Sequence, residues 1–296
     1  MTTRRRVARS VLVIAITIAV SCMFAACTKT VPRQTGTPQR IVSLSPSTTE
    51  ALFALGGGGL LVGRSRYCDY PPEATRLPQV GGYVDPNLEA VLGLAPDLVV
   101  GARGPMGTKI TDALDQRGIP WFFPKTESFQ EIRTMIGDLG QRTGHDHDAK
   151  RILADLDASL AHTRSRVAGR TKPRTLLVFG FEPIVVAGPA GFANEILTAA
   201  GGENVVREGE AYPTLGMERV LALDPDVILN AVMSEANAAA RISKDAPGWS
   251  KLRAVQAGRV VVISDESVLR PGPRVGRGVN VVAHALFPDL SQDSPK

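Results

Sequence analysis

Clusters of histidine, aspartate and glycine are the first places where this sequence could carry chemistry. The run His145–Asp148 (His-Asp-His-Asp) holds four side chains that could bind a metal ion. It follows Gly144 at the expected start of a helix, which favours a solvated helix cap over a metal site. The glycines at 56–59 lack the Gly-Lys-Ser/Thr ending of a phosphate-binding loop and predict a turn between a helix and a strand.

The sequence contains no recognisable set of catalytic residues. A Gly-x-Ser-x-Gly elbow, a His-Glu-x-x-His helix and paired zinc-binding cysteines are all absent. His284 lies in the apolar stretch Val279–Leu286, where we expect it to pack against neighbours. We therefore expect a protein that binds a molecule without changing it and has no metal or cofactor of its own. An enzyme is the alternative from another class, and the missing catalytic residues count against it.

Length and charge narrow the class further. The 296 residues suit two domains, and 44% hydrophobic with 21% charged residues is a globular composition. The net charge of +5 comes mostly from Arg4, Arg5, Arg6 and Arg9, without which 30 basic and 29 acidic side chains remain. Because the excess belongs to the N-terminus, the sequence does not predict a nucleic-acid-binding face.

The first 26 residues have the pattern of an export signal. An arginine cluster precedes an uncharged apolar stretch from Ser10 to Ala26, which is slightly short for the alternative of a transmembrane anchor. Phe24-Ala25-Ala26-Cys27 resembles the lipobox of bacterial lipoproteins, which implies a lipid on Cys27 that holds the protein at the outer face of the membrane or in the periplasm. Residues 27–38 then form a tether. Thr3–Arg6 leaves export by the general or the twin-arginine route open.

Cysteine usage excludes an internal disulfide in the folded part. Cys22 lies inside the signal and Cys27 is the lipidation site, so only Cys68 remains. A lone cysteine without a partner base is expected to be a small buried hydrophobic residue rather than a reactive thiol.

Short apolar runs bounded by proline or glycine predict two α/β lobes with buried, mainly parallel strands. A capping box at Ser47–Glu50 is expected to open a helix that reaches Leu55 and ends at Gly56. The expected strands are 41–44, 60–63, 98–100 and 121–123 in the first lobe and 175–179, 185–187, 227–229 and 260–263 in the second.

An internal repeat supports the two lobes. Residues 87–100 align without gaps on residues 216–229, and each copy predicts a short helix, a Pro-Asp turn and a buried strand. Between the lobes, apolar residues at helical spacing predict an amphipathic helix over Asp148–Val167, about 30 Å long. We expect it to connect the lobes, although it could belong to one of them. The expected segments are 39–144, a connecting helix within 145–170, 171–290 and a tail at 291–296.

Several motifs together resemble one family. Arg40–Glu50, Tyr67–Ala74, Gln79–Tyr83 with Asn87–Glu89, and Pro96–Val99 are similar to the helical-backbone (class III) substrate-binding proteins of ABC importers. That family captures cobalamin, ferric siderophores or haem outside the membrane. The resemblance runs from about Arg40 to Phe287 and is strongest to the cobalamin-binding branch. It implies two Rossmann-like lobes bridged by a single long helix, with the ligand in the cleft between them.

The resemblance also implies particular ligand contacts. They are Tyr67, Tyr83, Arg103, Phe181, Tyr212 and Arg274. The best-known member of the family has tryptophan at the positions of Tyr83 and Tyr212 and another at the position of Ala102. Phe181 could instead simply cap a strand. A cationic cleft for an anionic siderophore or haem is the alternative, formed by Arg64, Arg66, Arg103, Arg270, Arg274 and Arg277.

One glutamate in each lobe is implied to dock onto the permease dimer. Glu89 and Glu218 occupy these positions and the same column of the internal repeat. An acidic residue in the first turn of a helix also complements the helix dipole without any partner. We expect a monomeric, lipid-anchored receptor that delivers cobalamin to an ABC permease with small lobe motions. The alternatives are a ferric-siderophore or haem receptor and a lipoprotein that binds only partner proteins.

Overall fold

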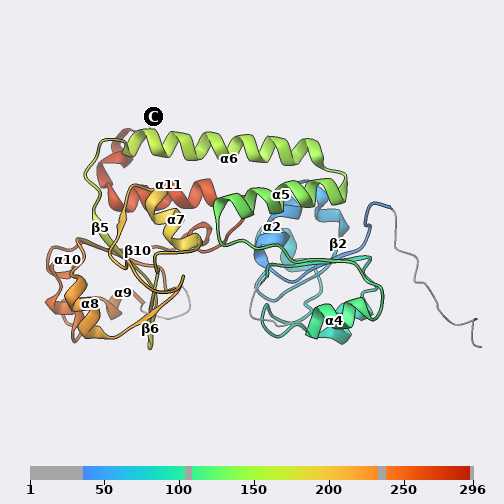
Figure 1. The fold of residues 1–296 in the computed structure, drawn as a ribbon, viewed down its shortest axis with the longest axis horizontal. Helices are drawn as coiled ribbons and strands as arrows, with labels where there is room; N and C mark the ends of the chain where they lie inside the picture. Colours follow the sequence, from blue (N-terminus) through green and yellow to red (C-terminus); the bar gives the residue numbers. More distant parts are fainter. Residues whose placement is uncertain (1–35, 104–108, 233–237, 294–296) are drawn as a thin grey trace, which may run out of the picture. The chain divides into compact units, whose positions relative to one another are not determined.

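The computed structural model describes residues 36–103, 109–232 and 238–293 (Figure 1). The predicted signal peptide, Cys27 and most of the predicted tether lie outside these residues. From Gly36 onward the chain forms one compact unit. Within the described part, no helix combines the length and the apolar composition needed to span a membrane.

The N-terminal lobe is built on a sheet of four short parallel strands. These are β1 (Ile41–Ser43), β2 (Leu61–Arg64), β3 (Leu98–Val100) and β4 (Trp121–Phe122), in the order β2-β1-β3-β4. Its helices are α2 (Pro46–Ala54), α3 (Leu88–Gly93), α4 (Lys109–Asp115) and α5 (Phe129–Thr143), with 3-10 turns η1 (Gly57–Leu60) and η2 (Pro72–Arg76). The central strands β1 and β3 are buried along their whole length, as their continuous apolar runs predict.

The C-terminal lobe contains a mixed sheet. Its strands are β5 (Arg174–Phe181), β6 (Ile184–Val186), β7 (Glu203–Asn204), β8 (Thr214–Leu215), β9 (Val227–Asn230) and β10 (Val260–Val262). The strand order is β10-β9-β5-β6-β8, and β7 pairs with the start of β5. Strands β10, β9, β5 and β7 run parallel to one another, whereas β6 runs antiparallel to both of its neighbours, β5 and β8. Around the sheet lie α7 (Phe192–Ala199), α8 (Met217–Leu223), α9 (Ala238–Arg241), α10 (Arg253–Gln256), α11 (Val275–Leu286) and the turns η3 (Trp249–Lys251), η4 (Glu266–Val268) and η5 (Pro288–Asp293).

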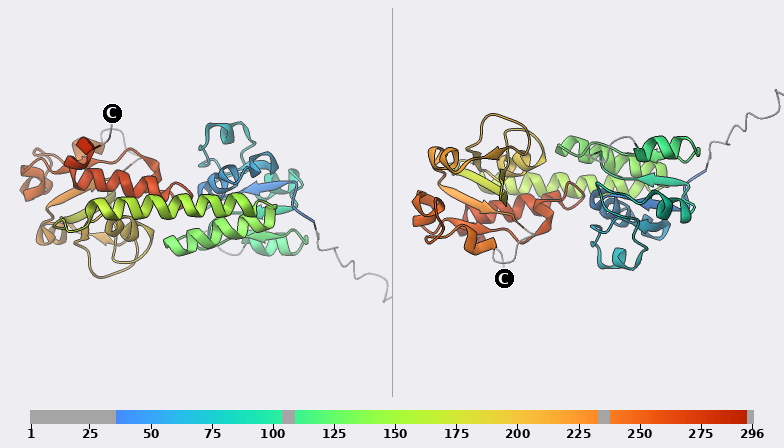
Figure 2. Two further views of the ribbon diagram at one scale, coloured as in Figure 1. Left: turned by 90° about the horizontal axis from the view of Figure 1, so that it is seen from above. Right: turned by 90° about the horizontal axis from the view of Figure 1, so that it is seen from below.

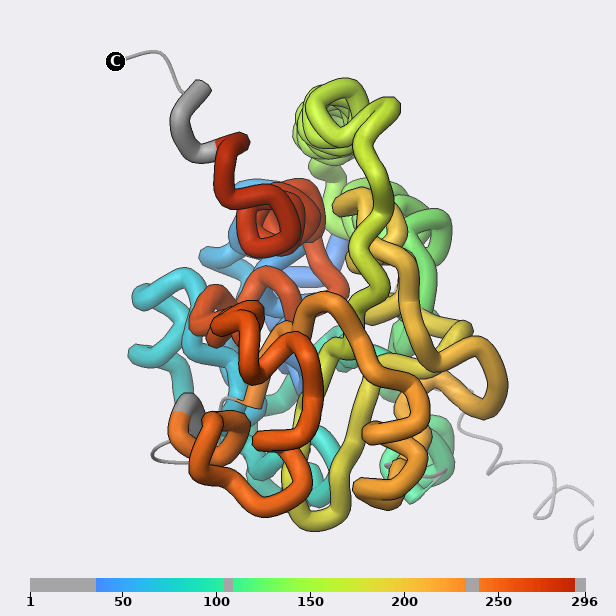
Figure 3. Tube along the Cα trace, turned by 90° about the vertical axis from the view of Figure 1, so that its left-hand side faces the viewer, coloured from blue at the N-terminus to red at the C-terminus, as the bar shows by residue number. Residues whose placement is uncertain are grey.

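A single long helix, α6 (Asp146–Val167), connects the lobes (Figure 2). It packs on α5 of the first lobe and on α11 and α7 of the second, so the possibility that it belongs to one lobe alone is wrong. Figure 3 shows α6 and α11 side by side above the C-terminal sheet. Its apolar face, which includes Ile152, Leu156 and Leu160, joins a hydrophobic core shared with both lobes. Each lobe also has a separate core of its own.

The internal repeat corresponds to equivalent structure in the two lobes. Its copies form α3 with β3 and α8 with β9. In the first lobe the backbone N–H of Arg40 donates to the Asp97 carboxylate at 2.9 Å, and in the second Arg174 donates likewise to Asp226 at 3.0 Å. Both arginine side chains also donate to carbonyl groups at the ends of α3 and α8, at 2.6 and 2.7 Å. These bonds satisfy helix-end carbonyls that lack partners within the helix.

Helix α2 begins differently from the prediction. Its N-cap is Ser45, whose hydroxyl accepts from the N–H of Thr48, and Pro46 fills the first turn. The predicted capping box at Ser47–Glu50 is therefore wrong, because the helix starts two residues earlier and Glu50 lies in its interior. The helix ends where expected, before Gly56 in a left-handed conformation (φ 85°).

The structure locates the residues singled out for their chemistry. Cys68 is a free, fully buried cysteine, and burial raises the pKa of its thiol. The run at 145–148 lies at the start of α6, and no group of three potential metal ligands occurs among the described residues. His284 is half-buried on α11.

Candidate ligand-binding site between the two lobes

Several of the predicted ligand contacts follow the carboxyl ends of strands. Tyr67 follows β2, Arg103 follows β3, and Phe181 is the last residue of β5. In open α/β sheets, ligands bind outside the carboxyl ends of the strands. Loops from the two lobes meet there: the Arg270 guanidinium of the second lobe donates to the carbonyl oxygen of Tyr67 at 3.0 Å. The fold therefore brings strand-end loops of both lobes together.

Tyr83 and Tyr212 come from opposite lobes and share one neighbour, Glu127. Burial raises the pKa of the Tyr83 phenol, and the Glu127 carboxylate raises it further. Tyr212 is 45% exposed, yet burial of its phenol, followed by the Glu127 carboxylate, raises its pKa to about 12. Glu127 itself precedes α5 and lies beside Gly191 at the start of α7, because a Cβ added to Gly191 would lie 3.3 Å from a Glu127 carboxylate oxygen. The two tyrosines thus flank the same junction between the lobes.

The remaining aromatic candidates differ in exposure. Tyr67 is 49% exposed, whereas Phe181 is 6% exposed and belongs to the core of the C-terminal lobe. The Phe181 ring is covered by the guanidinium of Arg241 at 5.3 Å, which agrees with a structural role at the strand end. Its neighbour Phe179 is half-buried and meets Tyr212 edge to face at 5.5 Å. Sequence reasoning missed Phe179; its place two residues before Phe181 on β5, a spacing that puts both on one face of a regular strand, was the available signal.

The candidate arginines are mostly engaged by the protein. Arg64 is buried and donates to backbone carbonyl groups, including that of Ser65 at 3.1 Å. Four others form ion pairs, which are Arg66 with Asp85 (2.8 Å), Arg270 with Asp69 (2.9 Å) and Glu266 (2.8 Å), Arg274 with Glu50 (2.6 Å), and Arg277 with Asp265 (2.7 Å). Arg103 is exposed and, like Arg64, has no carboxylate partner among the described residues. The charges therefore do not add up to a strongly cationic cleft.

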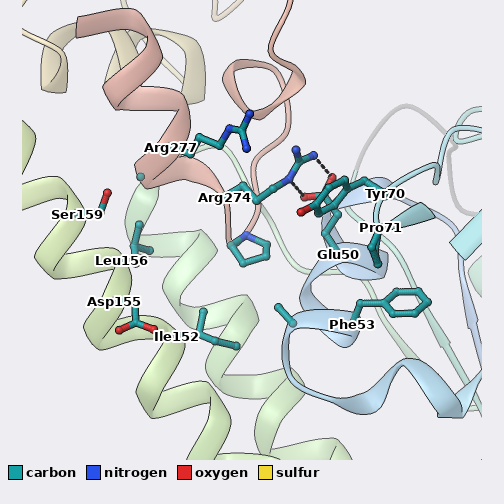
Figure 4. A pocket seen from close by; sticks show the side chains of 13 residues that line it. Glu50, Phe53, Tyr70, Pro71, Ile152, Asp155, Leu156, Ser159, Arg274 and Arg277 are labelled. Carbon is teal, nitrogen blue, oxygen red and sulfur yellow. Dashed lines mark hydrogen bonds and ion pairs between the residues drawn. The ribbon is translucent and has the colours of Figure 1, made fainter. Parts of the chain in front are cut away.

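Arg274 lies between the lobes rather than free in a cleft (Figure 4). Its guanidinium donates to both carboxylate oxygens of Glu50, at 2.6 and 2.8 Å, and lies 3.8 Å from the centre of the Tyr70 ring. Burial alone would lower the pKa of Arg274, but the Glu50 carboxylate outweighs it and the net shift is upward. A cavity of about 470 Å³ adjoins this pair, between α2, α6 and the start of α11. Of the six predicted cobalamin contacts, Arg274 alone lines this cavity in the described part of the chain, beside Tyr70 of the loop at 67–70 and Arg277 of the alternative cationic set.

The predicted docking residues occupy matching positions. Glu89 lies in the first turn of α3 and Glu218 in the first turn of α8, and both are exposed. Helix α3 is capped by Asn87, which accepts from the N–H of Ala90 at 3.1 Å, so Glu89 is not needed as a cap. Neither glutamate has an ion-pair partner within the described part of the chain.

Comparison with known proteins gives the family. The model of the periplasmic binding protein family matches residues 41–266. The chain belongs to this family. A vitamin B12-binding protein of Salmonella typhimurium is 30% identical over 248 residues, which cover 83% of this chain and 90% of the relative. One from Yersinia pseudotuberculosis is 33% identical over 201 residues, covering 68% and 71%.

Solved structures of periplasmic binding proteins agree with the fold. The periplasmic vitamin B12-binding protein of Vibrio cholerae superposes with a TM-score of 0.75 at 27% identity, covering 87% of this chain and 99% of that one. A periplasmic heme-binding protein of Pseudomonas aeruginosa gives 0.77 at 30% identity, covering 85% and 93%. The predicted family and the two-lobed α/β architecture are confirmed. As a periplasmic binding protein, the chain acts outside the cytoplasm as the solute-binding component of an ABC importer.

Proposed function

We propose that the chain binds cobalamin, or a related corrinoid, between its lobes and delivers it to an ABC permease. The vitamin B12-binding relatives support this ligand. The structural observation that carries it is the pairing of the candidate arginines with the chain's own carboxylates and carbonyl groups. Haem propionates and many ferric siderophores carry negative charge and need free arginines or lysines. A corrinoid presents mainly neutral amides, for which exposed tyrosines and backbone groups are better partners.

Tyrosines from both lobes supply the apolar contact in this proposal. Tyr67 and Tyr212 are 49% and 45% exposed, so their rings have surface available to a large flat ligand. Tyrosine buries much area at a small cost in side-chain entropy and keeps a polar tip. We expect dissociation constants between about nanomolar and micromolar, which correspond to roughly −12 to −8 kcal/mol.

The proposal includes attachment and delivery. Cys27 carries the lipid that keeps the receptor at the outer face of the membrane, and the protein acts as a monomer. Glu89 and Glu218 dock onto cationic residues of the two permease subunits. Their exposure and their equivalent positions in the two lobes support this role. Binding and release, rather than a chemical step, make up the function.

Titration with competing ligands tests the proposed function. Intrinsic fluorescence quenching is measured with cyanocobalamin, haemin and a ferric siderophore, on the wild type and on Tyr212→Ala. Cyanocobalamin is expected to bind most tightly, and Tyr212→Ala to weaken it about tenfold, or about 1.4 kcal/mol. Val84→Ala removes another exposed apolar side chain, from the residue after Tyr83, and serves as the control with unchanged affinity. Tighter binding of haemin than of cyanocobalamin would contradict the proposal.

A haem or ferric-siderophore receptor is the second candidate. The similarity to the heme-binding protein of Pseudomonas aeruginosa favours it, and the exposed Arg103 could pair with one anionic group. The same titration separates the two candidates. If haemin is the preferred ligand, Arg103→Ala should weaken haemin by more than it weakens cyanocobalamin.

A further inference from the structure

Glu50 and Arg274 make a buried ion pair between the two lobes. Glu50 is on α2 of the first lobe, and Arg274 stands at the start of α11 in the second, 224 residues later. The Glu50 side chain is 1% exposed and that of Arg274 is 17% exposed. Two parallel hydrogen bonds from a planar guanidinium and the stacked Tyr70 ring fix the geometry of this pair (Figure 4).

The segment that carries Arg274 is held against the first lobe at more than one point. Gly272 lies on α2, where an added Cβ would be 3.7 Å from the Cα of Ser47. Arg270 reaches the loop after β2, where it pairs with Asp69 and donates to the carbonyl of Tyr67. Segment 270–274 therefore joins the second lobe to the loop at 67–70, which contains an exposed tyrosine of the candidate site.

A cavity separates the ion pair from part of the connecting helix. Its α6 wall is formed by Ile152, Asp155, Leu156 and Ser159, and its opposite wall includes Phe53 of α2. Beside the cavity, Val275 is fully buried in the shared hydrophobic core, and Gly276 packs closely on Ser159 of α6. Between α2 and the start of α11, the ion pair and its stacked tyrosine are the polar contact that joins the lobes.

We propose that Glu50 and Arg274 are positioning residues that fix the spacing of the lobes and the placement of the Tyr67 loop, and thereby set how long a ligand is retained. Separation of the lobes would leave the Glu50 carboxylate inside the protein without a countercharge, which is strongly unfavourable. The pair therefore opposes opening even in the absence of ligand. Two bonds of the Arg274 guanidinium serve this contact, so its main role is in closure rather than in direct ligand binding.

Interlobe distance tests the proposal without any ligand. Fluorophores are attached through unnatural amino acids at the exposed positions Gln116 and Lys251, one in each lobe, and single-molecule energy transfer is recorded. The wild type is expected to give one narrow distribution, and Glu50→Gln a broader one shifted to longer distance. Asp157→Asn removes an exposed ion pair between α5 and α6 and should leave the distribution unchanged. A distribution for Glu50→Gln that matches the wild type overturns the proposal.

A double-mutant cycle links the pair to retention and rests on the proposed function. The dissociation rate of cyanocobalamin is measured for Glu50→Gln, Arg274→Gln and the double variant. Each single variant is expected to release the probe about tenfold faster, and the double variant no faster than either single one, because the same contact is lost. Additive effects would show that the residues act separately and would overturn the pairing.

If the wild type fails to bind cyanocobalamin, the proposed ligand is wrong, while the distance measurement still decides the role of the pair. A thermal unfolding curve for each variant identifies any that do not fold, and Arg274→Lys, which keeps the charge but loses the paired bonds, then replaces Arg274→Gln.

Discussion

Ala95 and Asp224 occupy the same position in the two lobes and share an unusual backbone conformation. Their φ angles are 46° and 37°, and they are the non-glycine residues with positive φ among the described parts of the chain. Each follows the short helix of its repeat copy and precedes a Pro-Asp pair. The left-handed conformation is unfavourable for residues with a Cβ. The same turn is thus kept in both lobes despite its cost.

Ala95→Gly should stabilise the protein. Ala95 is exposed, so glycine loses no packing and relieves the left-handed strain, for an expected gain of about 0.5–1 kcal/mol in the free energy of unfolding. Asp224→Gly is the matched comparison. It should give no gain, because the Asp224 carboxylate pairs with Arg253 and aspartate tolerates this conformation better than alanine. Urea unfolding measures both, and a destabilised Ala95→Gly would contradict the explanation.

Much of the fold could be predicted from the sequence because it depends on local patterns. Continuous apolar runs identify the buried strands, and the period of the apolar residues in α6 locates that helix to within two residues of its observed start. The strands β7 and β8 were not predicted, since each has only two residues and depends on pairing with a distant strand. Local patterns contain no information on such pairing.

The candidate site was less predictable for the same reason. Types and positions of the aromatic residues followed from the family resemblance, but charge pairing across the lobes did not. Glu50 fits a capping box in sequence, whereas in the fold its partner is 224 residues away. A cationic cleft was a reasonable alternative from six arginines, and it loses support once the carboxylates that neutralise four of them are located.

Tyr83 and Tyr212 should titrate late in alkaline solution, because the pKa of each phenol is raised. The Tyr212 pKa of about 12 lies above the ordinary value of 10, so its contribution to stability is present below pH 10 and is lost as the pH rises from 10 towards 12. The phenolate absorbance of Tyr212→Phe should lack the last step of the wild-type titration. Glu127→Gln should shift that step to lower pH, because the repelling carboxylate is gone. A step that does not respond to Glu127→Gln would place Glu127 away from Tyr212.

Asp265 should contribute to stability above acidic pH. Burial would raise its pKa, but bonds from Ser267 and the Arg277 guanidinium lower it by more, so the net pKa lies below the ordinary value of 3.8. This stability is present above pH 3.8 and is lost as the pH falls through the depressed pKa. Asp265→Asn should cost about 1.5–3 kcal/mol near neutral pH, and the difference from wild type should shrink in acid. Asp85→Asn, which breaks an exposed pair, is the control with a much smaller effect.

Charge reversal at the docking glutamates separates delivery from binding. Glu89→Arg with Glu218→Arg should abolish uptake of cobalamin by cells, because two cationic residues would then face the cationic surface proposed for the permease. The affinity for cyanocobalamin should stay within about twofold of wild type, since both residues are exposed and neither is among the predicted ligand contacts.

Controls for this experiment come from the same lobes. Glu73→Arg with Glu208→Arg reverses one exposed carboxylate in each lobe and should leave uptake intact, which removes net charge as the explanation. Each single reversal at Glu89 or Glu218 should reduce uptake by at least about tenfold, because an interaction with a two-subunit permease needs both lobes engaged at once. Loss of cyanocobalamin affinity in the double variant would assign these residues to ligand binding or folding instead. Normal uptake would contradict the docking role. The favourable interaction of each glutamate with its helix dipole would then be its only role.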